Sequence, residues 1–62
     1  MEHRIPLAVL AVWHLRHKRA VGWWFEGPGG VVAAGYHNTR KQAWDAFRDA
    51  YWYGRLPVIK KG

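Results

Sequence analysis

The sequence predicts an α+β fold in which a three-stranded antiparallel sheet is packed by one C-terminal α-helix. Short apolar and aromatic runs between residues 9 and 36 are separated by turn-forming glycine and proline. Thr39 then opens a segment in which apolar residues recur at helical spacing, and Gly54 stands where such a helix ends. Strands followed by a single helix predict the order β-β-β-α.

The length of 62 residues predicts a single small domain, residues 1–62, with a thin core. We expect the sheet and helix to occupy residues 8–54, with terminal segments at 1–7 and 55–62. Hydrophobic residues make up 50% of the chain and aromatic residues 16%, which favours a folded domain despite a net charge of +6.

The first predicted strand covers residues 9–18, where side chains alternate imperfectly between two faces. Residues 23–26 form the second strand, residues 27–30 a hairpin loop, and residues 31–36 the third strand. In the first strand one face carries Val9, Ala11, Trp13 and Leu15, and the other carries Leu10, Val12, His14, Arg16 and Lys18.

The predicted helix has Thr39 as its N-cap, with Gln42 at the capping-box position. Lys41 and Asp45 form an i,i+4 pair on its surface. The outer side also carries Arg48 and Asp49. The face predicted to pack on the sheet carries Ala43, Ala46, Phe47, Ala50 and Tyr51.

Trp23 and Trp24 are neighbours on a strand, so they point to opposite faces of the sheet. We expect Trp23 and Phe25 to face the helix, and Trp24 and Glu26 to lie outward beside Arg16 and Lys18. An outward Trp24 can lie against deoxyribose or stack on an unpaired base. Alternatively, it is covered by the N-terminal segment, by the tail from Leu56 to Ile59 or by a second copy of the chain. An apolar patch that includes Val12, Val31 and Ala33 would suit a protein interface equally well.

Several positions together resemble the AP2 family of DNA-binding domains, which occurs in plant ethylene-response factors and, diverged, in phage integrases and homing endonucleases. The stretch from Leu15 to Lys18 resembles the family's V-R-Q-R element, and Trp23 with Glu26 resembles its G-K-W-x-A-E element. A third family element is matched in spacing by Gly35, Thr39, Ala43, Ala46, Phe47 and Ala50. The resemblance covers His14 to Gly54.

This resemblance implies that the sheet enters the major groove with its outer face. Arg16 and Lys18 match the two first-strand arginines of the family, and Glu26 matches a second-strand acid. The family's remaining base-reading positions fall at Pro28, Val31 and Ala33, which carry no such side chain. The expected binding is therefore only weakly selective for sequence.

The sequence offers no good candidate residues for catalysis or for metal binding. The chain has neither cysteine nor serine, and Thr39 is assigned to the helix cap. His14 and His17 are expected on opposite faces of a strand, so a shared metal would need a kink. We expect a protein that is not an enzyme, with no cofactor and no metal.

The apolar stretch 5–13 is too short to span a bilayer and is followed by basic residues, so no membrane association is expected. The lack of cysteine gives no sign of an oxidising compartment, and we expect a cytoplasmic protein, nucleoid-associated if bacterial.

The excess of ten Lys and Arg over four Asp and Glu suits a polyanion such as nucleic acid. The predicted function is a small phage or bacterial DNA-binding factor, accessory to transcription or recombination, that docks its sheet on duplex DNA. The alternative is a protein-interaction module or homodimer that uses the apolar part of the same face. Trp52 either packs on the tail or marks a dimer contact. The predicted DNA-binding residues are Arg16, Lys18, Arg19, Trp24, Glu26, Arg40 and Lys41.

Overall fold

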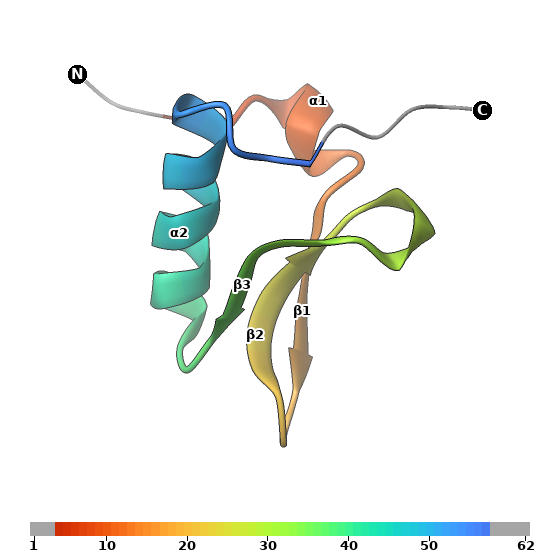
Figure 1. The fold of residues 1–62 in the computed structure, drawn as a ribbon, viewed down its shortest axis with the longest axis vertical. Coiled ribbons are helices and arrows are strands. Elements are labelled where there is room, and N and C mark those ends of the chain that lie inside the picture. Colours follow the sequence, from red (N-terminus) through yellow and green to blue (C-terminus); the bar gives the residue numbers. More distant parts are fainter. Residues whose placement is uncertain (1–3, 58–62) are drawn as a thin grey trace.

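The computed structural model describes residues 4–57 and confirms the predicted fold class. The strands β1, β2 and β3 form one antiparallel sheet in that order, and the long helix α2 follows (Figure 1). The elements are α1 (Leu7–Leu10), β1 (His14–Lys18), β2 (Gly22–Glu26), the 3₁₀ turn η1 (Pro28–Gly30), β3 (Val32–His37) and α2 (Arg40–Trp52).

The prediction that the first strand begins at Val9 is wrong, because residues 7–10 form the short helix α1. Pro6 precedes this helix, and its carbonyl accepts hydrogen bonds from the backbone N–H groups of Val9 and Leu10. Apolar residues follow one another without a break here, so periodicity alone does not separate strand from helix. Ala11, predicted to share the inner face with Trp13, is exposed.

The β1–β2 hairpin is regular along its whole length and confirms the predicted pairing of the first two strands. Arg16 lies opposite Trp24, and His17 lies opposite Trp23. Residues that face each other across an antiparallel pair share one side of the sheet. Trp23 and Trp24 therefore point to opposite faces, as predicted.

The β2–β3 pairing is interrupted by a bulge in β3. Trp23 pairs with His37 and Phe25 pairs with Ala33, so residues 34–36 lie opposite the single residue Trp24. Ala34 and Gly35 both have positive φ, 61° and 78°. A positive φ is unusual for Ala34, because this residue carries a Cβ. The bulge thus bends β3 through two successive left-handed residues.

Helix α2 begins and ends at the predicted signals. The Thr39 side chain accepts a hydrogen bond from the backbone N–H of Gln42 at 3.1 Å. At the other end Gly54 takes a φ of 67°, which reverses the chain after Tyr53. The Arg55 N–H then bonds back to the Ala50 carbonyl at 2.7 Å.

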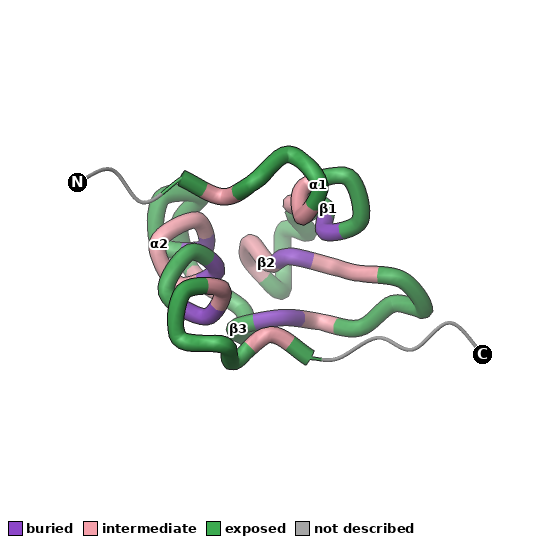
Figure 2. The backbone as a smooth tube through the Cα atoms, turned by 90° about the horizontal axis from the view of Figure 1, so that it is seen from above, coloured by how far each residue is buried: buried purple, intermediate pink, exposed green. Residues whose placement is uncertain are grey.

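The core lies between α2 and the inner face of the sheet (Figure 2). The Phe25 and Phe47 rings are stacked with centroids 4.0 Å apart, and both side chains are fully buried. Trp13 closes the end of the core near α1, with its ring 5.9 Å from that of Phe47. The partly buried residues that pack around this centre are Ile5, Val9, Leu10, Leu15, Trp23, Trp44 and Leu56.

Both terminal segments contribute to this packing. Ile5 precedes α1 and Leu56 follows α2, and each contacts the core cluster. The tail therefore packs on the core at Leu56, whereas Val58 and Ile59 lie outside the described residues.

Candidate nucleic-acid interface

One face of the sheet is turned away from α2 and carries most of the predicted binding residues. We call it the outer face. Cross-strand pairing assigns its members, since Arg16 faces Trp24, Lys18 faces Gly22, and Glu26 lies between His14 and Val32. The side chains on the outer face are His14, Arg16, Lys18, Trp24, Glu26, Val32 and Tyr36.

Arg16, Lys18 and Arg19 give the outer face and its adjoining turn their positive charge. All three side chains are exposed, and none of them forms an ion pair within residues 4–57. Glu26 is the acidic residue of this face among the described residues. Arg16 and Lys18 alternate along β1, so their charges line one edge of the sheet.

Trp24 lies near the centre of the outer face, directly across from Arg16. It is partly buried, and its indole N–H points to the Glu26 carboxylate at 3.4 Å, a long hydrogen bond. Glu26 is also partly buried at the end of β2. Glu26 therefore contacts the Trp24 indole from the same strand, β2.

Tyr36 is a residue of this face that sequence reasoning missed. Its ring meets the Trp24 ring edge-on, with centroids 5.5 Å apart and an interplanar angle of 61°. The Tyr36 side chain is 56% exposed. An isolated glycine inside a strand often marks a bulge, so Gly35 was the signal in the sequence that could have drawn attention to Tyr36.

The structure places Arg40 and Lys41 away from the outer face, on the first turn of α2. Both side chains are exposed. Because β3 runs into α2 at the end of the sheet where the β1–β2 turn lies, these cations and Arg19 share one end of the molecule (Figure 1). Helix α2, however, packs on the opposite face of the sheet.

Lys41 is engaged by Asp45, as the i,i+4 spacing predicted, with Nζ 2.9 Å from the carboxylate. Arg48 contacts the same carboxylate at 3.1 Å. The hydrogen bond from Lys41, together with the charges of Lys41 and Arg48, holds the pKa of Asp45 below its usual value of 3.8. Asp45 thus screens part of the charge at the start of α2.

The predicted apolar patch of Val12, Val31 and Ala33 does not form as expected. Ala33 is 1% exposed and pairs with Phe25, so it faces the core. The family-based assignment of Ala33 to the outer face is wrong for the same reason. Val12 and Val31 remain exposed, at 46% and 37%.

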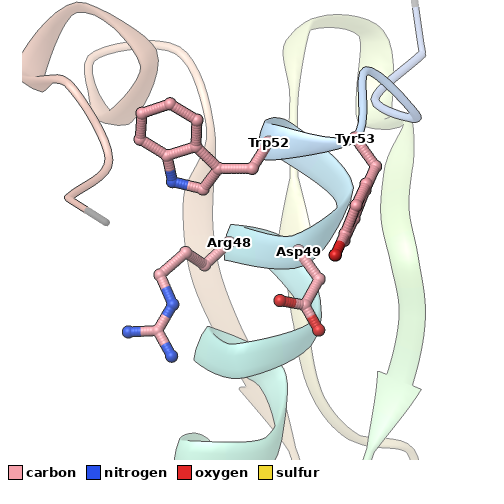
Figure 3. Close-up of a pocket in the computed structure, with 4 residues that line it drawn as sticks. All are labelled: Arg48, Asp49, Trp52 and Tyr53. Atoms are coloured by element: carbon pink, nitrogen blue, oxygen red, sulfur yellow. The ribbon is translucent and has the colours of Figure 1, made fainter. Parts of the chain in front are cut away.

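A separate hollow of about 390 Å³ lies on the side of α2 that faces away from the sheet (Figure 3). Arg48, Asp49, Trp52 and Tyr53 line it. Trp52 is 49% exposed and Tyr53 72%, and the Arg55 guanidinium lies 5.5 Å from the Tyr53 ring centre. Two exposed aromatic side chains, Trp52 and Tyr53, therefore lie on this side of α2 and do not belong to the outer face of the sheet.

His14 and His17 point to opposite faces of β1, as predicted, and the His17 ring lies against Trp23 with centroids 4.3 Å apart. Residues 4–57 contain no group of three or more potential metal ligands. Within the same residues, no helix is long and apolar enough to cross a membrane.

No protein family, curated protein or solved structure matches this chain.

Proposed function

We propose that this protein binds DNA through the outer face of its sheet, docking on duplex DNA by electrostatic attraction. The observation that carries the proposal is the set Arg16, Lys18 and Arg19, which are exposed and form no ion pair within residues 4–57. Cations without a protein partner are available to phosphates, and each neutralised phosphate releases a counterion.

Two features indicate that selectivity for sequence is weak. The commonest specific base contact is that of arginine with guanine. Within residues 4–57 the strands carry one arginine on the outer face, Arg16, so few such contacts are available. The third strand contributes Val32 and Tyr36 instead of further cations. The resemblance to AP2-like domains agrees with sheet docking and remains part of this proposal, as does a regulatory role in a phage or bacterium.

A mobility-shift titration with a random-sequence duplex tests the proposal. Arg16→Ala should weaken binding about tenfold, because a charge-assisted phosphate contact is worth of order 1 kcal/mol or more. Arg48→Ala is the matched control, since it removes the same charge from the α2 side, where Lys41 still holds Asp45. Equal losses in both variants would show a response to net charge alone and would contradict docking by this face.

The second candidate function is protein interaction, and the exposed aromatics of α2 favour it. Trp52 and Tyr53 border a hollow large enough for a side chain. For this second candidate we propose an interface on α2, whereas the sequence-based alternative used the apolar part of the sheet. Sedimentation equilibrium distinguishes the candidates, because a homodimer formed there should dissociate in a Tyr53→Ala variant while DNA binding is retained.

A further inference from the structure

The bulge in β3 sets the position of Tyr36. If the register of Phe25 and Ala33 continued unbroken, Ala34 would face Trp24, and Tyr36 would face Gly22. The extra residues instead bring the Tyr36 ring to 5.5 Å from the Trp24 ring. The displacement along the strand is about 7 Å, the length of two residues.

This placement requires unusual backbone. Ala34 takes a φ of 61°, although a Cβ disfavours the left-handed region, and the His37 ring lies 2.7 Å from the Ala34 carbonyl oxygen. Gly22 is tightly approached too, because a Cβ there would fall on the carbonyl oxygen of His37. The chain therefore holds a partly exposed aromatic pair in a defined geometry within the charged surface.

The pair has the chemistry of a stacking site for nucleobases. Tyr36 is 56% exposed and offers ring surface beside Trp24, while Arg16 lies across from Trp24. Aromatic rings between cations bind unpaired bases by stacking while the cations contact the backbone. In a closed duplex the π faces of the bases are covered by their neighbours, and only base edges are open in the grooves.

We propose that Trp24 and Tyr36 stack on unpaired bases, so that the preferred substrate of the outer face is DNA with a single-stranded segment. The inference rests on the proposed function, because it uses the same cations to hold the backbone. It narrows the substrate class from duplex DNA in general to DNA that is locally open.

The test compares a fully paired duplex with the same duplex carrying a short central thymine bubble, by fluorescence anisotropy at one salt concentration. The wild-type protein should bind the bubble at least about fivefold more tightly, since stacking of one base contributes about 1 kcal/mol or more. Tyr36→Ala should abolish this preference and leave affinity for the paired duplex within about twofold. The ratio of the two affinities is measured on one preparation, so partial unfolding does not imitate the result.

Two control variants sharpen the measurement. Tyr36→Phe keeps the ring and should keep the preference. Tyr53→Ala removes an exposed tyrosine from the α2 side and should also keep it. Equal binding of both DNAs by the wild type, or a preference that survives Tyr36→Ala, would overturn the stacking inference while the duplex proposal stands. Failure to bind either DNA would overturn both.

Discussion

The Trp13 ring lies directly over Gly27, so that a Cβ added to this glycine would stand 2.7 Å from Cζ3 of the indole. Trp13 is 5% exposed and joins the segment after α1 to the core. Gly27 also donates its N–H to the Val31 carbonyl at 2.7 Å, which closes the β2–β3 connection. A small residue at position 27 therefore lets the N-terminal segment pack against this connection.

Gly27→Ala should destabilise the domain by about 1–3 kcal/mol, because the added methyl group overpacks the contact with Trp13. Trp13→Phe with Gly27→Ala should lose less stability than the sum of the two single changes, since the smaller ring leaves room for the methyl group. Urea denaturation of the four proteins measures the coupling. Strictly additive losses would show that the two residues do not meet.

Trp23→Ala should cost more stability than Trp24→Ala. Trp23 packs against the core and its ring contacts the tilted ring of His17, whereas Trp24 lies on the outer face. Both tryptophans are only partly buried, so we expect losses below those for a fully buried aromatic residue, about 2 and 1 kcal/mol. Thermal unfolding followed by circular dichroism gives the order. The reverse order would contradict the assignment of faces.

Ala34→Gly should leave the protein equally stable or raise its stability by up to about 1 kcal/mol. Glycine relieves the strain at a φ of 61°, and this gain offsets the greater entropy of the unfolded chain. Ala34→Val should have the opposite sign, because a β-branched side chain tolerates positive φ least. Denaturant midpoints compare the three proteins, and a stabilising valine would rule out the bulge.

The stability contributed by Asp45 should depend on pH. Its pKa is lowered in the folded protein by Lys41 and Arg48, so its contribution is present above the ordinary value of 3.8 and disappears as the pH falls through the folded-state pKa. Asp45→Asn should therefore have a lower Tm than the wild type at neutral pH. The difference should close below pH 3.8. A difference that persists unchanged in acid would exclude the ion pairs as its source.

Local signals in the sequence predicted much of the fold. Thr39 caps α2, Gly54 ends it, and the glycine-rich loop at 27–30 joins β2 to β3, as expected from turn and capping chemistry. The predicted faces were correct for β1 and β2, whose pairing contains no bulge. Phe25 accordingly faces α2, and Trp24 faces outward.

The errors arose where tertiary contacts decide the outcome. The run from Val9 to Trp13 is apolar throughout, and its helical turn is selected by packing of Val9, Leu10 and Trp13 on the core. The prediction exchanged the two faces of the third strand, so Ala33 was expected on the outer face although it faces the core. With the observed parity Tyr36 belongs to the outer face, and the two-residue insertion opposite Trp24 moves it along the strand until it lies beside Trp24, a displacement that alternation alone does not predict.

The most direct test of DNA docking by the outer face is the salt dependence of affinity for one unrelated duplex. For the wild type, about three to five neutralised phosphates should give a log-log slope of roughly −3 to −5. Arg16→Ala with Lys18→Ala should make the slope shallower by about 2, because each lost phosphate contact removes about 0.9. A wild-type slope near zero, or an unchanged slope in the double variant, would contradict the proposal.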